Sequence, residues 1–332
     1  VSFRPYVIQL TTNDGVADEL IVTGNTFSGS AAGRAQALGN DDAGADAVKL
    51  VVNNNIFKDI TNAQQICYWN FNSETTTADF SKNYYDIDVL ANPDRIYFNG
   101  AASDSVDLYE MGVFPIYKEL NADGTINEES AYTPSLTYVA QVGETKYLRL
   151  SDAVAAVKAN GGTLTLLADA NESMTFNYPA GGAHVEITID LNGKNVTSDT
   201  YTLGVRNSGT KVTFIDTAEA DGKVSTTGSS HSAVVVRDGA SVIIDGGKFE
   251  GVYVVNVNDG SSSATIKNGV FTSIGTRAIN NAGTLVIEGG SFTAGSWSAV
   301  CANTSTTIKG GSFTAGFDGT FEYYGGLLDL SE

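Results

Sequence analysis

The chain has 332 residues and carries 19 Lys and Arg against 38 Asp and Glu, a formal net charge of −19 at pH 7. This acidity argues against nucleic acid as a partner, because a phosphate backbone would be repelled. No uninterrupted apolar run approaches the roughly 18 residues of a membrane span, so we expect no membrane insertion. Two cysteines exclude a disulfide scaffold, and we expect Cys67 and Cys301 to be small buried residues rather than ligands or nucleophiles.

The first strands of the chain carry a short pattern that recurs after 30 residues. Residues 22–27, Val-Thr-Gly-Asn-Thr-Phe, align with residues 52–57, Val-Asn-Asn-Asn-Ile-Phe. Gly and Asn tolerate a positive φ, and stacked Asn side chains can form ladders between neighbouring strands. The pattern predicts solenoid coils in the first half, with Asn in both the positive-φ and the ladder roles. The chain opens at Val1 with neither Met nor a signal-peptide pattern, which indicates a processed or trimmed segment.

Two polar loops offer oxygen ligands of the kind that Ca²⁺ prefers. One contains Asp41, Asp42 and Asp46, and the other spans residues 121–128, whose order of side chains resembles the rear of an EF-hand loop without its flanking helices. For the second loop, the favoured interpretation is a solvated linker, and the Ca²⁺ site is the alternative. Apart from Ca²⁺, the sequence predicts no cofactor.

A linker and a helix are predicted in the middle of the chain. Residues 119–137 are polar and turn-rich, which is typical of a linker. Residues 151–161 form the one good helical stretch, with Ser151 as the expected N-cap and Gly161 as the expected C′ residue. A short helix near 151–160 would cover the open end of a solenoid, whose bare strand would otherwise invite edge-to-edge association.

The second half contains an internal repeat, Ile-x-(Gly/Asn)-Gly-x-Phe. The isoleucines are spaced by 22, 21 and 21 residues, and so are the phenylalanines: Ile244, Ile266, Ile287 and Ile308, with Phe249, Phe271, Phe292 and Phe313. Each unit joins short β-branched runs through a Gly-rich bend and has no helical period. A coil of about 21 residues with two or three strands is the unit of a parallel β-helix. We therefore expect the Ile and Phe columns to form internal ladders.

Three runs at the opening of this half carry a family resemblance. Residues 147–154 read Tyr-Leu-Arg-Leu-Ser-Asp-Ala-Val, residues 162–169 read Gly-Thr-Leu-Thr-Leu-Leu-Ala-Asp, and residues 189–194 read Ile-Asp-Leu-Asn-Gly-Lys. They resemble the pectate-lyase-like right-handed β-helix domains of large cell-surface proteins of gut bacteria. Residues 83–85 and 114–117 resemble the closing coils of a similar domain. The resemblance implies export to a bacterial surface, but the superfamily includes lyases, hydrolases, tailspikes and adhesins.

Two columns of side chains are expected on the outside of the second segment. The position after each repeat Ile is occupied by charges of alternating sign, Asp245, Lys267, Glu288 and Lys309. Coils lie about 4.8 Å apart, so this column forms either a ladder of weak surface pairs or a ligand-facing strip. The second column places Tyr253, Arg277, Trp297 and Phe317 just before a strand. Its aromatic rings either stack on sugar rings or fold back to shield the core.

Catalytic sets typical of the related enzymes are absent from the sequence. Related hydrolases carry Asn-Thr-Asp, Asp-Asp and His-Gly motifs on consecutive coils, because two carboxylates must flank the glycosidic bond. Related lyases need a basic residue beside acidic Ca²⁺ ligands, which Arg237 near Asp238 and Asp216 could imitate. We therefore expect no catalysis, although a polysaccharide lyase or glycoside hydrolase stays the alternative.

Together these patterns predict an all-β protein with two right-handed parallel β-helix segments. The expected parts are the closing coils of one segment at 1–118, a linker at 119–137 and a second segment at 138–332 with an N-terminal capping helix. The expected function is a secreted or cell-surface adhesion or ligand-presenting module, with a glycan or a host or microbial surface ligand as partner. A monomer is expected, whereas a phage tail-fibre segment, the third alternative, would form trimers.

Overall fold

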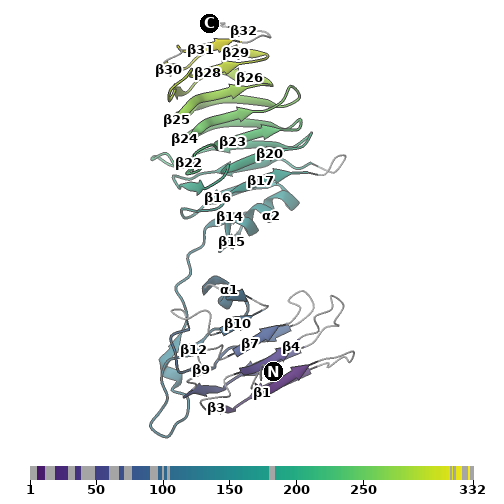
Figure 1. Ribbon diagram of the computed structural model, residues 1–332, viewed down its shortest axis with the longest axis vertical. Coiled ribbons are helices and arrows are strands. Elements are labelled where there is room, and N and C mark those ends of the chain that lie inside the picture. Colours follow the sequence, from purple (N-terminus) through teal and green to yellow (C-terminus); the bar gives the residue numbers. More distant parts are fainter. Residues whose placement is uncertain are drawn as a thin grey trace, which may run out of the picture. The chain divides into compact units, whose positions relative to one another are not determined.

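The computed structural model describes residues 6–11, 19–28, 34–38, 49–59, 67–70, 77–89, 96–98, 101–102, 105–178, 184–314, 316, 319–323 and 328–329. Strands make up 51% and helices 8% of the structure. Most strands are short, and parallel coils stack into a β-solenoid of about 9 turns (Figure 1). This confirms the predicted fold class. The chain divides into two compact units, Val1–Leu136 and Thr137–Glu332.

The first unit contains three sheets, and from β1 to β10 consecutive strands of the chain belong to different sheets. One sheet consists of β1 (Tyr6–Thr11), β4 (Arg34–Leu38), β7 (Cys67–Asn70) and β10 (Ile96–Phe98), with β11 (Ala101–Ala102) antiparallel to β10. Another consists of β2 (Glu19–Thr23), β5 (Lys49–Asn53) and β8 (Thr77–Asp79). The third consists of β3 (Thr26–Ser28), β6 (Ile56–Lys58), β9 (Tyr84–Tyr85) and β12 (Ile116–Tyr117), with β13 (Ala131–Tyr132) antiparallel to β12. Parallel strands contributed once per coil define a β-helix.

A ladder of asparagine side chains lies inside this unit at the bend before the third sheet. The backbone N–H groups of Asn25 and Asn55 donate to the side-chain Oδ1 atoms of Asn55 and Asn83, at 3.0 and 2.9 Å. Asn55 and Asn83 are fully buried. Asn54, the residue before Asn55, has a φ of 56°. The predicted ladder and positive-φ roles of Asn are therefore confirmed.

Aromatic rings stack beside this ladder, on the strands that follow it. The ring centroids of Phe27 and Phe57 lie 4.9 Å apart, and those of Phe57 and Tyr85 lie 5.1 Å apart. All three side chains are buried. The ring spacing matches the distance between hydrogen-bonded strands, so each coil adds one ring to a continuous column.

The segment after β12 belongs to the first unit. Leu120 and Ile126 form an antiparallel bridge around a tight turn, the 3₁₀ turn η2 (Glu128–Ser130) follows, and β13 then pairs with β12. A short helix, α1 (Ser105–Glu110), precedes β12 and buries Leu108.

The second unit opens with a hairpin and the predicted helix. Strands β14 (Ala140–Val142) and β15 (Thr145–Tyr147) pair antiparallel, and β14 also runs antiparallel to β16 (Gly162–Leu166). Helix α2 (Leu150–Asn160) contacts β14, β16 and β17 (Met174–Asn177). The helix lies at the end of the stack where the coils begin (Figure 1).

The ends of α2 agree with the prediction at one terminus only. Gly161 follows the helix with a φ of 73°, and its N–H donates to the Val157 carbonyl. The N-terminal prediction is wrong, because Arg149 rather than Ser151 occupies the N-cap position and makes no side-chain cap bond. Instead the Glu172 carboxylate accepts from the N–H groups of Leu150 and Ser151, at 3.3 and 3.0 Å. A carboxylate from a neighbouring coil thus satisfies the free N–H groups and the positive end of the helix dipole.

The coils of the second unit have three sides, which we name faces A, B and C in chain order. Face A contains β16, β18 (Ile187–Asp190), β21 (Lys211–Ile215), the first parts of β24 (Ser241–Val257) and β25 (Ser263–Asn281), β26 (Thr284–Ile287), β29 (Thr306–Ile308) and β32 (Leu328–Asp329). Face B contains β19 (Val196–Ser198), β22 (Lys223–Thr226), the middles of β24 and β25, β27 (Ser291–Thr293) and β30 (Ser312–Thr314). Face C contains β17, β20 (Leu203–Arg206), β23 (Ser232–Arg237), the last parts of β24 and β25, β28 (Val300–Ala302) and β31 (Phe321–Tyr323).

The two predicted internal columns are confirmed. The four repeat isoleucines pair in register on face A and are buried: Ile244, Ile266, Ile287 and Ile308. The four phenylalanine rings stack on face B, with centroids 5.1, 4.9 and 4.9 Å apart. At the bend between them, Gly269 has a φ of 129°, and a Cβ there would lie 3.1 Å from the Phe271 ring. Glycine is therefore needed where the chain turns sharply over the aromatic column.

The alternating charges lie outside the same coils. Asp245, Lys267, Glu288 and Lys309 are all exposed. Lys267 lies 3.9 Å from Asp245, and Lys309 lies 3.5 Å from Glu288. At this exposure each pair contributes about 0.5 kcal/mol or less.

Candidate functional site

The predicted aromatic column lies on face C of the second unit. Tyr253 and Arg277 are register partners on β24 and β25, and Trp297 lies just before β28 on the next coil. The guanidinium carbon of Arg277 lies 4.1 Å from the centre of the Trp297 ring. The structure therefore brings three of the predicted residues together. The fourth, Phe317, lies outside the described residues.

An acidic residue that the sequence analysis missed completes this cluster. Glu322, on β31, accepts a hydrogen bond of 2.5 Å from Nε of Arg277 and one of 3.0 Å from the hydroxyl of Ser298. Only 9% of the Arg277 side chain and 14% of the Glu322 side chain are exposed. We name Tyr253, Arg277, Trp297 and Glu322 the face C cluster.

Arg277 and Glu322 stabilise each other's charged form in this cluster. Burial by itself would raise the pKa of Glu322, but the hydrogen bonds from Arg277 and Ser298 outweigh burial and lower it. Burial would also lower the pKa of Arg277, and the bond to Glu322 raises it instead. Both groups stay charged near neutral pH, and each neutralises the other. Arg277 therefore packs on the Trp297 ring while its charge is neutralised by Glu322.

The outer surface of the cluster is aromatic and amide-rich. Trp297 is 41% exposed, and Tyr253 is half-buried. Along β24 and β25, Asn256 and Asn280 are register partners, and the side-chain amide of Asn280 donates to the side-chain Oδ1 of Asn256 at 2.9 Å. Both asparagines are half-buried, so part of each reaches the surface. This arrangement combines stacking surfaces with neutral hydrogen-bonding groups.

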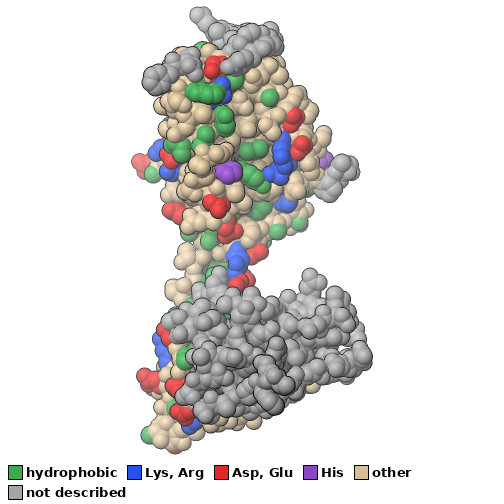
Figure 2. Space-filling view, in the orientation of Figure 1, with side chains coloured by type: hydrophobic (Ala, Val, Ile, Leu, Met, Phe, Trp, Pro, Cys, Tyr) green, Lys and Arg blue, Asp and Glu red, His purple; other side chains and the backbone are tan. Residues whose placement is uncertain are grey.

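The wider surface of the second unit carries no dominant charge on the side seen in Figure 2. Apolar, acidic and basic side chains are interspersed there among polar ones. In the alternating column, Asp245 and Glu288 pair with Lys267 and Lys309.

The three residues considered as a lyase-like set, Asp216, Arg237 and Asp238, do not form one site. Asp216 follows β21, where the chain turns from face A to face B, and accepts from the N–H groups of Gly193 and Gly222. Arg237 ends β23 on face C, where its Nε lies 3.3 Å from the carboxylate of Asp238. Asp216 stabilises a turn at one corner of the coil, and the Arg237–Asp238 pair lies at another.

Cys301 is buried on face C, as predicted, with 2% exposure. Burial is the main cause that raises the pKa of its thiol, although the positive charge of Arg277 acts in the opposite direction. A protonated, buried thiol is a poor nucleophile. The side chain of Cys67 lies outside the described residues.

The calcium candidates gain no support from the described residues. Asp41, Asp42 and Asp46 lie outside them. In the loop at 121–128, the Asp123 carboxylate accepts from the backbone N–H and the hydroxyl of Thr125, at 3.0 and 2.6 Å, which is the bonding of a tight turn. Within the described ranges, no group of three His, Cys, Asp or Glu side chains has the arrangement that could hold a metal ion.

With this geometry established, comparison with family models, characterised proteins and solved structures gives no significant match. In the described part of the chain, neither α1 nor α2 has the length and apolar character needed to traverse a bilayer. The parallel β-solenoid is thus established by the coordinates, and the argument for function rests on the chemistry of the cluster itself.

Proposed function

We propose that this protein is a non-catalytic adhesion module that presents face C of its second unit to glycans. The observation that carries the proposal is the half-exposed Trp297 ring beside Tyr253, held in place by the buried Arg277–Glu322 pair. A ring that is fixed before binding loses little side-chain entropy when a ligand stacks on it.

The neighbouring amides favour a sugar over a flat apolar ligand. A sugar ring has an apolar C–H face that stacks on Trp and Tyr, and its hydroxyl edge both donates and accepts hydrogen bonds. Asn256 and Asn280 supply both kinds of group next to the rings. Tyr253, Arg277 and Trp297 lie on three successive coils, so the surface extends along the stack, which suits a chain of sugars.

The proposal places the module at the surface of a bacterium, as a monomer within a larger exported protein related to the pectate-lyase-like β-helix domains. The resemblance at residues 147–154 and 162–169 motivates this setting. Solution mass by light scattering tests the monomer, since a tail-fibre segment would give three times the monomer mass.

The proposal is tested by affinity electrophoresis of the protein in gels that contain plant, host or microbial polysaccharides. At least one polysaccharide should retard the wild-type chain, and Trp297→Ala should reduce that retardation at least fivefold. Tyr138→Ala is the matched control, because Tyr138 is 48% exposed in the same unit but lies away from face C, before β14. The proposal fails if no polysaccharide retards the protein or if both variants behave alike.

A parallel incubation of protein, polysaccharides and Ca²⁺, analysed by size exclusion, separates adhesion from catalysis. Unchanged polysaccharide lengths agree with adhesion. Shortened chains would replace the proposal with a lyase or hydrolase activity.

A further inference from the structure

A cavity of about 460 Å³ opens in the second unit, at the corner where the chain turns from face B to face C. Ser173 lies just before β17, Asp199 lies between β19 and β20, and Thr227 lies between β22 and β23, so the first three coils all contribute to its wall. The volume falls within the range of about 300–1,000 Å³ that is typical of small-molecule sites. All eight residues that line the cavity are polar or charged, and five of them carry hydroxyls. We name it the corner pocket.

The same corner continues along the stack to Trp297 of the face C cluster. Hydrogen bonds join it from coil to coil, each 3.1 Å long: from the N–H of Val252 to the carbonyl of His231, from the hydroxyl of Thr276 to the carbonyl of Val252, and from the N–H of Trp297 to the carbonyl of Thr276. His231 lies on the same coil as Thr227, and Trp297 lies three coils further on. At about 4.8 Å per coil, the corner pocket and the Trp297 ring are separated by about 14 Å along the stack.

Three polar side chains of the corner pocket are not used by the fold. Among the residues that the structure describes, the side chains of Asn171, Ser173 and Asp199 form no hydrogen bond or ion pair, and all three residues are exposed. Glu172 is engaged, because its carboxylate accepts from two N–H groups of α2. The corner pocket therefore offers a ligand one amide, one hydroxyl and one carboxylate that have no other partner among these residues.

These groups suit the hydroxyl edge of a neutral sugar. An amide and a hydroxyl both donate and accept hydrogen bonds, whereas a carboxylate only accepts them. The hydroxyls of a neutral sugar donate to Asp199, but the ionised group of a uronic or sulfated sugar has no proton to donate. The pocket contains no aromatic side chain, so stacking is left to Trp297 and Tyr253.

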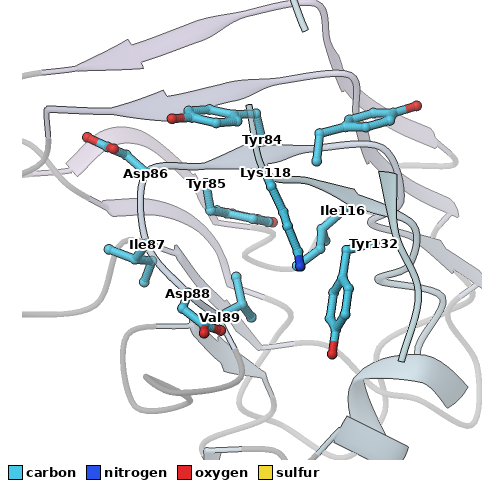
Figure 3. Close-up of a pocket in the computed structure, with 10 residues that line it drawn as sticks. Tyr84, Tyr85, Asp86, Ile87, Asp88, Val89, Ile116, Lys118 and Tyr132 are labelled. Carbon is cyan, nitrogen blue, oxygen red and sulfur yellow. The ribbon is translucent and has the colours of Figure 1, made fainter. Parts of the chain in front are cut away.

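The pocket of the first unit, of about 370 Å³, differs because its groups already contact one another (Figure 3). Nζ of Lys118 lies 4.1 Å from the centre of the Tyr132 ring. The carboxylate of Asp86 accepts from the backbone N–H of Asp59 at 3.0 Å. Its lysine, its outer ring and one of its carboxylates are therefore engaged, unlike the three free side chains of the corner pocket.

We propose that one neutral, linear oligosaccharide binds along this corner, with one end stacked on Trp297 and Tyr253 and the other hydrogen-bonded in the corner pocket. The ligand spans the distance of about 14 Å between these ends and passes the exposed His231 on the way. Two subsites joined by one chain raise its affinity above that of a fragment that reaches only one of them. This inference rests on the proposed function, because it extends the same glycan site.

The test is isothermal titration calorimetry of the whole chain with four neutral series, cello-, manno-, xylo- and N-acetylated chito-oligosaccharides, each as the trisaccharide and the hexasaccharide. In at least one series the hexasaccharide should bind about tenfold more tightly than the trisaccharide. Asp199→Ala and Ser173→Ala should each weaken the hexasaccharide about threefold or more and leave the trisaccharide unchanged. Neither side chain bonds to the described part of the fold, and equal thermal unfolding midpoints verify that both variants fold.

Two further variants complete the test. Glu219→Ala is the matched control, because it removes an exposed carboxylate from the coil of Thr227 at the corner between faces A and B, and it should bind both lengths as the wild type does. Trp297→Ala should weaken both lengths, since it removes the stacking end. If Trp297→Ala has that effect but the hexasaccharide gains nothing over the trisaccharide, or the two pocket variants behave like Glu219→Ala, this inference is overturned and the proposed function stands. If no probe binds, or if Trp297→Ala changes nothing, both are overturned.

Discussion

Nε of Arg277 and a carboxylate oxygen of Glu322 lie 2.5 Å apart across two coils of face C, although 45 residues separate them along the chain. The Arg277 guanidinium packs on the Trp297 ring, and both side chains of the pair are nearly buried. The same pair therefore stabilises the last coils and fixes the exposed Trp297 ring of the proposed binding surface.

The first prediction concerns that pair. Glu322→Gln should lower the free energy of unfolding by about 2 kcal/mol, because it leaves the buried Arg277 charge without a counterion. Urea unfolding followed by tryptophan fluorescence measures the change. Glu288→Gln is the matched control, since it breaks an exposed pair with Lys309 and should change stability by at most about 0.5 kcal/mol. Equal effects of the two variants would contradict a structural role for Glu322.

The second prediction concerns the asparagine ladder of the first unit. Asn83 donates to the carbonyls of Val52 and Phe80 and accepts from the N–H of Asn55. Asn83→Ala should therefore cost about 3 kcal/mol, since three buried groups lose a partner at once. Asn54→Gly should be nearly neutral, because Asn54 is exposed and glycine accepts its φ of 56°. Circular-dichroism melting tests both, and a fully tolerated Asn83→Ala would exclude the ladder as a source of stability.

The third prediction concerns the bend over the phenylalanine column. Gly269→Ala should destabilise by about 2 kcal/mol, because alanine strains the φ of 129° and its Cβ would lie 3.2 Å from the Gly247 carbonyl oxygen. Gly260→Ala lies in an open turn, 3.9 Å from its nearest neighbour, and should be neutral or slightly stabilising. Chemical denaturation of the two variants makes the comparison. If the two variants have the same unfolding free energy as the wild type, the bend does not require glycine.

The fourth prediction concerns pH. Burial by itself would raise the pKa of Asp259, but hydrogen bonds from Ser261, the backbone of Asp238 and Ser262 outweigh it and lower the pKa to about 2. An unfolded Asp titrates near 3.9, so the ionised carboxylate stabilises the fold above about pH 4. That contribution is lost as the pH falls from about 4 through 2.

The variant Asp259→Asn isolates this effect. Its deficit in unfolding free energy should be about 1 kcal/mol at pH 7 and should shrink steadily below pH 4. Denaturation at pH 7, 5, 4 and 3 measures the deficit, and the carboxylate carbon shift in NMR reports the pKa directly. A titration midpoint near 3.9 or a pH-independent deficit would contradict the prediction.

Much of the fold follows from local chemistry that recurs at a constant interval. The repeat of 22, 21 and 21 residues predicts which isoleucines and phenylalanines stack, because a coil of constant length returns each position to the same side of the solenoid. The position of Gly161 after the helix was predictable as well, since a positive φ after a helix favours glycine. The Asn ladder was predictable for the same reason, because the motif at 22–27 repeats at 52–57.

The sequence by itself determined the all-β solenoid, its internal columns and the alignment of Tyr253, Arg277 and Trp297, since all of these depend on the period of the coil. Only the tertiary structure decided that Glu322 neutralises Arg277, that Glu172 caps α2, and that the Lys118 ammonium lies over the Tyr132 ring. Those contacts join side chains from coils or loops of unequal length, where no repeat specifies the register. Their geometry is set by how the whole stack packs, and the local sequence carries no signal of it.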